Sequence, residues 1–425
     1  MRVIPAPPPY AADVRRALVL LTVLAAACNS AVAETPTSDA PRTPPTTAER
    51  ATTTATTSST TTTTTTIPLA TVEVLTDDDV PRDVARAVTT VLDYAADDRN
   101  EPPPAPRGLV EHVSAVGALE SVTLSEFSSA DLADGSTVAV VSSSEDDIFL
   151  AVDDGSGWQV VGAHLASLGA EPWYGEEPLM VLILGSDARS GPGLTAHSDS
   201  IHVVTALPSQ GTGSILGWPR DSYVPTPHGE MKITALMVVG GGPEATRDQF
   251  REYWELPISG YIVTAFKGFE RLVGVLGSVL IDIPRALPTQ EWFAGFSAGE
   301  QRLNPVRALD YVRTRKKIPG GDLTRSKNQG VMMLAVLRMI QLNGIETLPH
   351  LVAAITQHTT TDLTPAQLLQ FGAAAFALDP DSIENQVLPG KVGRTRGASV
   401  VFLDPEADDI VADLREDGLL TPAEP

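Results

Sequence analysis

LMVLILG, residues 179–185, contains no polar side chain. A short continuous apolar run of this kind is typical of a β-strand that is buried on both faces of a sheet. Further apolar runs of strand length follow it, at residues 201–207, 214–219, 260–266 and 278–284. Stretches with helical spacing lie among them, at residues 245–255, 266–277 and 304–315. This alternation of strands and helices predicts an α/β fold.

The stretch 304–315 also carries helix-start signals. Asn304 is a favourable N-cap residue, and Pro305 follows at the first helical position, where its fixed φ is tolerated. A second helix is predicted from Leu323 to about Asn343, with Asp322 placed to cap it. Further helices and a late strand at residues 398–403 are expected after Pro349.

The N-terminus has the pattern of an export signal. Two arginines, Arg15 and Arg16, precede an apolar run at residues 17–27, which is too short to span a bilayer. LAAAC, residues 24–28, resembles a bacterial lipobox, so residues 1–27 are predicted to be a lipoprotein-type signal peptide and Cys28 the lipidated first residue. Ordinary cleavage after Ala33 and an uncleaved anchor are the alternatives. Since Cys28 is the only cysteine, no intramolecular disulfide can form.

These signals predict that the protein lies on the outer face of the bacterial cytoplasmic membrane, in the cell wall, held by a lipidated Cys28 or by the N-terminal segment. Residues 28–67 are rich in Thr and Pro and predict a disordered linker, because they cannot bury enough apolar surface to offset their ordering entropy. Residues 68–170 predict a small α+β accessory module, with a helix at 80–95 and strands at 136–143, 147–154 and 158–164. The module shows no cluster of residues suited to catalysis or ligand binding and is interpreted as a spacer or docking unit, ahead of the predicted α/β domain at 176–421.

The distribution of charge is uneven. The chain has 53 acidic and 30 basic residues, a formal charge of −23, which argues against general nucleic-acid binding. Yet YVRTRKKIPGGDLTRSKNQ, residues 311–329, contains six basic residues and one acid, Asp322. A local basic cluster on an acidic protein indicates a discrete anionic ligand.

Charged residues also stand at the predicted strand ends, where open α/β sheets bind ligands. Asp187 and Arg189 follow the first apolar run, Arg220 and Asp221 follow 214–219, and Asp199 precedes 201–207. Within the basic cluster, Arg325 and Gln329 are four residues apart and share a helical face. Gly320 and Gly321 let the backbone bend closely around a ligand. A helix start with arginines beside it is a ready anion site.

Six motifs in this order resemble the LytR–CpsA–Psr (LCP) family. They are ILGSDARSG at 183–191, HSDS at 197–200, WPRDSYV at 218–224, KITA at 232–235, GGP at 241–243, and the basic stretch 311–329. The resemblance covers residues 176–345 with specific motifs and extends loosely to about residue 405. It implies an LCP-type central mixed sheet flanked by helices. Residues 1–170 fall outside it.

LCP proteins are extracytoplasmic phosphotransferases, so the resemblance implies transfer of a glycopolymer from a polyprenyl-pyrophosphate carrier to the muramic acid 6-hydroxyl of peptidoglycan. Two other functions stay open: a polyprenyl-pyrophosphate hydrolase, and a non-catalytic lipoprotein that binds wall polymer or lipid carrier. Arabinogalactan, a teichoic acid and a capsule are all candidate polymers.

The resemblance also implies roles for individual residues. The metal-binding carboxylates fall on Asp187 and Asp199, and such hard oxygen donors suit Mg²⁺. The residues that bind pyrophosphate are Arg189, Arg220, Lys232, Arg313, Arg315, Arg325 and Gln329. The catalytic set is Arg220, Arg313, Arg315 and Asp322, and a general base, if one acts, is Asp322 or Asp199. Two positions depart from the family pattern: Thr234 replaces an Asn, and His197 stands where Arg or a small residue is common.

A polyprenyl chain needs an apolar tunnel, because each buried CH₂ is worth about 0.8 kcal/mol. The apolar faces of residues 266–277 and 330–340 are the candidates for its walls. Met332, Met333 and Met339 could line it, since methionine adapts to flexible ligands, or they could be ordinary core residues.

Overall fold

The computed structural model describes residues 68–117, 119–188 and 196–422. The predicted signal peptide (1–27), Cys28 and the linker (28–67) lie outside the described residues, and so does Arg189. In the part that is described, no single helix is long and apolar enough to cross a membrane. The segments Asp322–Asn343 and Ile345–His358 reach the required length and composition only together, and they are bent by 103° relative to each other.

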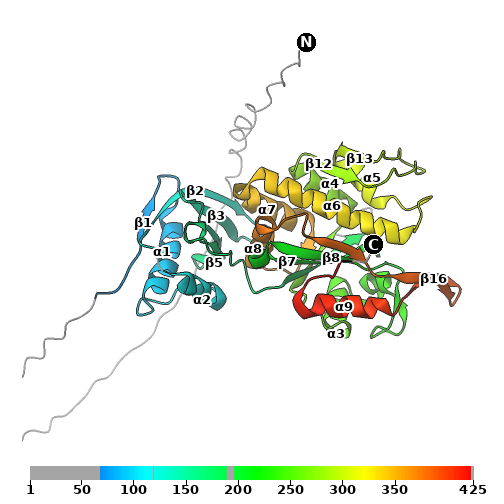
Figure 1. Cartoon of the computed structure of the whole chain (residues 1–425), viewed down its shortest axis with the longest axis horizontal. Coiled ribbons are helices and arrows are strands. Elements are labelled where there is room, and N and C mark those ends of the chain that lie inside the picture. The colour runs from blue at the N-terminus through cyan, green and yellow to red at the C-terminus, as the bar shows by residue number, and fades with distance from the viewer. Residues whose placement is uncertain (1–67, 118, 189–195, 423–425) are drawn as a thin grey trace, which may run out of the picture. The chain divides into compact units, whose positions relative to one another are not determined.

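A six-stranded sheet forms the centre of the larger part of the chain (Figure 1). In spatial order its strands are β14 (Thr360–Thr361), β11 (Gly260–Thr264), β6 (Leu179–Ser186), β7 (Ser198–Leu207), β8 (Thr212–Gly217) and β15 (Glu384–Val387). The pairs β6–β11 and β8–β15 are parallel, and the remaining pairs are antiparallel. The sheet is therefore mixed, which confirms the predicted fold class.

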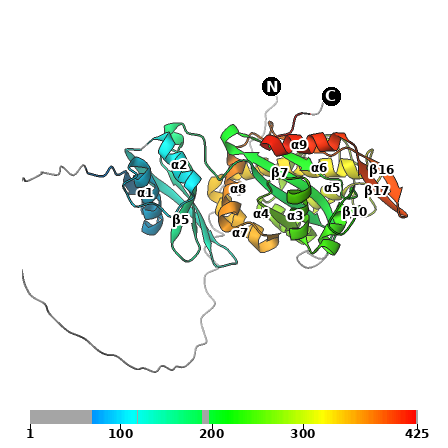
Figure 2. The same ribbon diagram turned by 90° about the horizontal axis from the view of Figure 1, so that it is seen from below.

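Strand β6 is the apolar run LMVLILG, and its side chains alternate between the two faces of the sheet. Met180, Leu182 and Leu184 pack with helices α3 (Pro243–Tyr253) and α9 (Glu406–Asp417). Leu179 and Val181 point the other way, toward α7 (Leu348–His358) and α8 (Pro365–Ala377). Both faces are covered by helices, as Figures 1 and 2 show, and this explains why residues 179–185 of the strand carry no polar side chain.

Three more helices lie on the α7 side of the sheet. They are α4 (Phe266–Val275), α5 (Pro305–Arg313) and α6 (Asp322–Asn343), which share an apolar cluster with the hairpin of β12 (Val279–Ile283) and β13 (Gly299–Leu303). The run at 278–284 is thus a strand, but of this separate hairpin. The predicted cap of α5 is confirmed, because Asn304 accepts a hydrogen bond of 2.9 Å from the Arg307 backbone N–H.

The predicted cap of α6 is wrong by one residue. Gly321 occupies the N-cap position with φ of 51°, and Asp322 is the first helical residue without a side-chain cap bond. Only glycine adopts this backbone conformation at low cost, so the turn Gly320–Gly321 fixes where α6 begins. The Asp322 carboxylate is free to pair with arginines instead.

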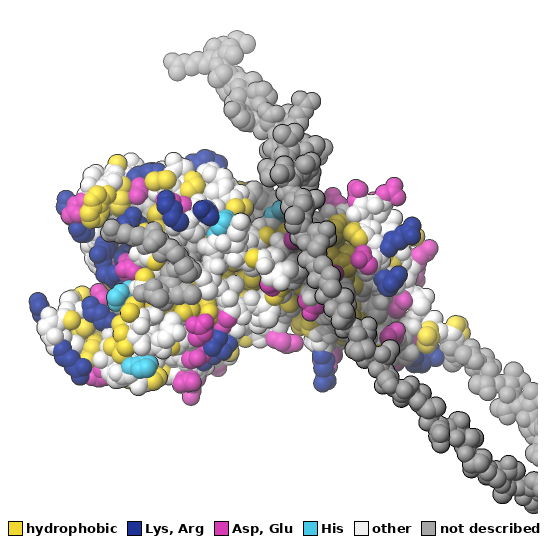
Figure 3. Space-filling view, turned by 180° about the vertical axis from the view of Figure 1, so that it is seen from behind, with side chains coloured by type: hydrophobic (Ala, Val, Ile, Leu, Met, Phe, Trp, Pro, Cys, Tyr) yellow, Lys and Arg dark blue, Asp and Glu magenta, His cyan; other side chains and the backbone are white. Residues whose placement is uncertain are grey.

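The remaining elements are short. Strands β9 (Tyr223–Val224) and β10 (Met231–Lys232) pair with each other, and so do β16 (Gly390–Thr395) and β17 (Ala398–Leu403). Single helical turns occur at Ala166–Leu168, Pro208–Gln210, Ile233–Ala235, Leu236–Gly240 and Ile345–Thr347. On the side seen in Figure 3, basic and acidic side chains are interspersed over the described surface.

The accessory module has a five-stranded sheet in the order β1 (Glu73–Thr76), β2 (Ser121–Asp131), β3 (Thr137–Ser143), β4 (Ile148–Asp153) and β5 (Trp158–His164). One face packs on α1 (Arg82–Ala96) and α2 (Arg107–Val116). The other face places Val138, Val140 and Leu150 in one apolar cluster with helices α7 and α8. The module thus shares a hydrophobic core with the helices that cover the central sheet.

Candidate active site

Four strands bring their ends to one edge of the central sheet. Strands β6, β8 and β11 end there, and the antiparallel strand β7 begins there, with Ser198 opposite Ser186. The loops that follow β6 and β8, the start of β7 and the start of α4 therefore converge at this edge. This is the carboxyl edge at which the sequence predicted a ligand site.

A cluster of two arginines and two aspartates lies at this edge. Arg220, from the segment after β8, pairs with Asp199 in β7. Arg325, in the first turn of α6, donates from Nη2 to the Asp199 backbone oxygen at 3.0 Å, and its Nη1 lies 3.5 Å from the Asp199 carboxylate. Arg325 Nη2 also lies 2.7 Å from Asp322 Oδ1, and Arg220 Nε lies 3.7 Å from the same oxygen. Three separate chain segments thus meet through four charges.

Some hydrogen-bonding atoms of this cluster have no hydrogen-bond partner of good geometry among the described residues. The Nε atoms of Arg220 and Arg325 and the Oδ1 atom of Asp322 are buried without a hydrogen bond of good geometry to any described residue. The side chain of Arg325 is 5% exposed, and burial lowers the pKa of its guanidinium. Burial also lowers the pKa of Arg220, but the carboxylates of Asp199, Asp322 and Asp221 outweigh it and raise the pKa overall. Both guanidiniums stay charged and can donate to an anion.

Lys232 lies next to this cluster. Its Nζ donates to Asp221 Oδ1 at 2.8 Å, and Asp221 Oδ2 lies 3.9 Å from Arg220 Nε. Thr234, which stands where the family usually has Asn, donates from Oγ1 to the Ser198 backbone oxygen at 2.8 Å. Its backbone N–H donates to the Arg220 backbone oxygen at 3.1 Å. The substituted side chain therefore still ties the Arg220 turn to the start of β7.

His202 lies beneath the first turn of α6 and is fully buried. Its Nε2 lies 3.1 Å from the Ser326 backbone oxygen and its Nδ1 3.1 Å from Ser200 Oγ. A carbonyl can only accept, so Nε2 carries the proton and the Ser200 hydroxyl donates to Nδ1. This links β7 to the residue that follows Arg325 and fixes the position of α6.

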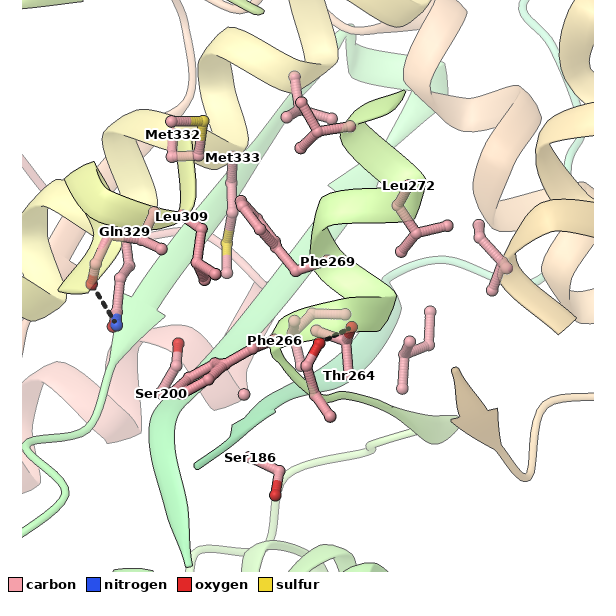
Figure 4. Close-up of a pocket in the computed structure, with 18 of the residues that line it drawn as sticks. Ser186, Ser200, Thr264, Phe266, Phe269, Leu272, Leu309, Gln329, Met332 and Met333 are labelled. Carbon is pink, nitrogen blue, oxygen red and sulfur yellow. Dashed lines mark hydrogen bonds between the residues drawn. The ribbon is translucent and has the colours of Figure 1, made fainter. Parts of the chain in front are cut away.

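Arg313 and Arg325 line part of an apolar cavity of about 350 Å³. Figure 4 shows this cavity. Its walls come from α4, α5, α6 and α7 and from the sheet, and the aromatic rings of Phe266 and Phe269 project into it. Met332 and Met333 line the cavity, which is one of the two alternatives that the sequence predicted for them. Met339 does not line the cavity, and both Met332 and Met339 belong to the core cluster of α6 with the β12–β13 hairpin.

A second, polar cavity of about 300 Å³ lies on the other side of the arginines. It is lined by Asp187, Asp199, Phe266, Gln290, Glu291, Trp292, Phe293, Arg313, Arg315, Lys316 and Arg325. Asp199, Phe266, Arg313 and Arg325 line both cavities, so the two spaces meet at charged side chains. The Arg313 guanidinium lies 4.5 Å from the centre of the Phe266 ring. This cation–π contact helps to hold the guanidinium between the two cavities.

Two carboxylates in the polar cavity suit a hard divalent cation. Asp187 and Asp199 line the same space, and among the described residues no cation pairs with Asp187. The part of the chain that is described contains no group of three or more acidic, histidine or cysteine side chains fit to hold a metal by itself. Mg²⁺ commonly uses only one or two carboxylates, with water and phosphate oxygens completing its shell, so the donor set fits.

The structure brings most of the predicted site residues together. The residues Asp187, Asp199, Arg313, Arg315, Arg325 and Gln329 line one or both cavities, and Arg220 and Asp322 are joined to them by ion pairs. Lys232 is linked only indirectly, because it pairs with Asp221, which lies beside Arg220. Phe266 lies in the predicted tunnel-wall segment 266–277 and Lys316 lies in the basic stretch, but the sequence analysis singled out neither as a site residue, and it did not predict Trp292 at all. Phe266 lies two residues after the end of β11, as the first residue of α4, so the strand-end rule could have found it. Nothing in the local sequence marks Trp292, because its neighbours belong to a distant segment.

A profile of the LytR_cpsA_psr family matches residues 163–416, more than half of the chain. Among curated proteins, the chain is 27% identical over 198 residues to the polyisoprenyl-teichoic acid–peptidoglycan teichoic acid transferase TagV of Bacillus subtilis. It is 27% identical over 192 residues to the corresponding TagU of Enterococcus faecalis. These matches cover 44% of this chain and 50% and 63% of the two relatives, so the chain spans less than two thirds of either.

A solved structure has the same fold. The crystal structure of TagV from B. subtilis superposes with a TM-score of 0.51 at 22% identity, over 58% of this chain and 100% of that one. At this identity the match concerns the fold alone. It supports the central mixed sheet and its flanking helices as the architecture that carries the site.

Proposed function

The chain belongs to the LytR–CpsA–Psr family, and from this premise we propose that it is a phosphotransferase that moves a glycopolymer from a polyprenyl-pyrophosphate carrier to peptidoglycan. The names of its relatives state a transfer of teichoic acid from a polyisoprenyl carrier to peptidoglycan. The observation that carries the proposal is the position of the arginines between an apolar and a polar cavity. A lipid diphosphate that carries a sugar has the same order of parts: an apolar chain, an anionic diphosphate and a polar sugar.

The apolar cavity would hold the first isoprene units of the carrier. Phe266, Phe269 and Met333 face this space, and flexible methionine and aromatic walls suit a chain with many conformers. The cavity is short for a long polyprenyl chain, so the rest of the chain would extend past it. At about 0.8 kcal/mol for each buried CH₂, even a few isoprene units contribute strongly to binding.

The arginines would hold the diphosphate and stabilise charge during transfer. The acceptor hydroxyl oxygen bonds to the phosphorus that bears the sugar, the P–O bond to the bridging oxygen breaks, and polyprenyl monophosphate leaves. Arg220, Arg313 and Arg325 donate to the phosphate oxygens, with bidentate geometry available to each guanidinium fork. Asp322 or Asp199 takes the hydroxyl proton if the loose transition state requires a base.

A magnesium ion is part of the proposal. Asp187 and Asp199 would hold it, and it would supply charge neutralisation at the phosphate oxygens when bound. Its binding would release Asp199 from at least part of its pairing with Arg220 and Arg325. The freed arginines would then be available to the diphosphate.

The acceptor that we propose is the muramic acid 6-hydroxyl. A primary hydroxyl is the least hindered nucleophile that a glycan strand offers, and attack by it forms the phosphodiester. Mass spectrometry of digested product would identify the linked atom, and a linkage to another hydroxyl would refute this part.

Arg220→Ala tests the catalytic proposal. Removal of one charge-stabilising donor should lower the transfer rate by about 10²- to 10³-fold, measured as carrier-linked glycan transferred to peptidoglycan. Arg220→Lys should stay strongly impaired, because a single ammonium cannot reproduce the fork. Arg338→Ala is the matched control, since Arg338 forms an exposed ion pair with Asp381.

The same assay separates the rival functions. A hydrolase would release the glycan phosphate equally with and without peptidoglycan, and a carrier-binding protein would bind the lipid without turnover. Near-wild-type transfer by a folded Arg220→Ala protein would refute the role of the arginine.

Anchoring at the outer membrane face through Cys28 is also a proposal. Cys28→Ala should remove the lipid and release the protein from the membrane fraction. Mass spectrometry of the mature N-terminus would check this, and an unmodified Cys28 in the wild type would refute lipidation.

A further inference from the structure

Trp292 is unusually exposed. Its side chain is 79% exposed, the highest value among the large apolar side chains of the described residues. It lies between β12 and β13 and lines the polar cavity with Arg313 and Arg315. A large aromatic ring left in water beside a polar cavity is typical of a recognition surface rather than of a core.

The segment that carries Trp292 is braced against the basic stretch. Gln290 donates from Nε2 to the Lys316 backbone oxygen at 2.9 Å, and the Lys316 backbone N–H donates to Gln290 Oε1 at 3.2 Å. The ammonium of Lys316 pairs with Glu291 at 3.0 Å and lies 5.7 Å from the centre of the Trp292 ring. The segment that carries the ring is therefore positioned near the arginines before any ligand arrives, which reduces the entropy cost of binding.

The two cavities determine in which orientation a lipid diphosphate would bind. The apolar cavity meets the polar one at Arg313 and Arg325. A carrier whose lipid lies in the apolar cavity and whose diphosphate lies at these arginines has its first sugar in the polar cavity. There the sugar meets an aromatic face, and the carboxylate of Glu291, 57% exposed, can accept from its hydroxyls. An aromatic platform beside a hydrogen-bond acceptor suits the apolar C–H face and polar rim of a pyranose ring.

We propose that the polar cavity is a pyranose subsite for the first sugar of the diphosphate-linked donor, with Trp292 as its stacking platform. This rests on the proposed function and adds to it a specificity-determining residue. The competing source of the same chemistry is a sugar of the acceptor glycan, and the experiment separates the two.

The test uses the full chain and two synthetic lipids, farnesyl diphosphate and farnesyl diphosphate that carries N-acetylglucosamine. Trp292→Ala should weaken binding of the sugar-bearing lipid by about tenfold and leave the affinity for farnesyl diphosphate unchanged, as expected for one lost stacking contact. Trp292→Phe should restore most of the affinity. Tyr253→Ala, which removes an exposed aromatic side chain that lines neither cavity, should bind both lipids like the wild type.

The inference is overturned if Trp292→Ala binds both lipids like the wild type. It is also overturned if that variant keeps donor affinity but has a raised KM for the peptidoglycan acceptor, because the ring then serves the acceptor. An equal loss for both lipids would assign Trp292 to the diphosphate and not to the sugar, which overturns it as well. If the wild type binds neither lipid, the proposed function itself fails.

Discussion

Arg325 shows how a single residue links the fold to the site. It is the fourth residue of α6, its side chain is 5% exposed, and it contacts both Asp199 and Asp322. Two partly buried carboxylates near one guanidinium offset part of its desolvation, and removal of either aspartate would leave this buried charge less well compensated. An incoming diphosphate can take over the donors that these carboxylates now occupy.

His202 gives a prediction at the residue scale. Burial lowers its pKa from 6.5 to about 4, so the folded protein keeps the ring neutral where the unfolded chain binds a proton. Between these two values the unfolded state holds more protons, and stability therefore falls as the pH is lowered. At about pH 5 this group should cost about 2 kcal/mol of unfolding free energy relative to neutral pH.

Urea unfolding of wild type and His202→Gln at several pH values measures this cost. Glutamine can still donate to the Ser326 carbonyl but does not titrate, so the variant should lose less stability on acidification. The same pH slope in both proteins would contradict a neutral buried His202.

In helix α6, contacts with a neighbouring strand outweigh the helix propensity of individual residues. A Cβ added at Gly330 would clash with Asn385 Oδ1, so the glycine allows α6 to approach the neighbouring strand β15 closely. Asn385 donates in turn to the Lys327 backbone oxygen. The glycine thus serves packing where helix propensity alone favours another residue.

Gly330→Ala should therefore destabilise the protein, although Gly→Ala in a helix normally stabilises it by about 0.5–1 kcal/mol. Gly274→Ala is the matched control, because Gly274 lies in helix α4 with only one atom, at 3.9 Å, near its added Cβ. That change should raise the melting temperature. Thermal unfolding of both variants checks the contrast, and a stabilised Gly330→Ala would show that Asn385 moves aside freely.

The cavity beside α6 supports a second prediction at this scale. Met333→Trp should fill part of the space and weaken binding of a long polyprenyl diphosphate by about tenfold or more, since each excluded CH₂ is worth about 0.8 kcal/mol. Binding of dimethylallyl diphosphate, which needs little of the cavity, should be unchanged. Met339→Leu is the control, because Met339 lies in the core outside the cavity. Equal effects on the long and short lipids would mean that the chain does not bind there.

At the scale of the whole molecule, the accessory module and the following domain share one hydrophobic cluster, although the sequence predicts them as separate units. Val140 and Leu150 of the module form one buried cluster with Leu348, Val352 and Leu369 of helices α7 and α8. Those helices also support the wall of the apolar cavity, through Leu351 and Ile355. The module therefore contributes to the stability of the site without lining it.

Leu150→Ala tests this coupling. Leu150 is fully buried, so its truncation should cost about 2–5 kcal/mol. Calorimetry should show one unfolding transition in both proteins, shifted to lower temperature in the variant. Leu342→Ala, at a side chain that is 74% exposed, should leave the transition in place. Two separate transitions, only one of which moves, would indicate that the module unfolds independently.

Much of the fold and site could be predicted from the sequence because the signals are local. The apolar run at 179–185, the Asn304–Pro305 start and the ordered motifs each act within a few residues. The errors and omissions concern contacts between distant segments. Asp322 was assigned to a helix cap, but Arg220 and Arg325 compete for its carboxylate. Met339 and Met333 look alike in sequence, and only packing separates them.

By itself, the sequence determined the family, the mixed α/β class and the set of charged residues, because periodicity and motif order are properties of the chain. The tertiary structure alone decided that two cavities of opposite polarity meet at the arginines, and that Trp292 borders one of them. Such features depend on which side chains from distant segments exclude water together, and no local pattern encodes that.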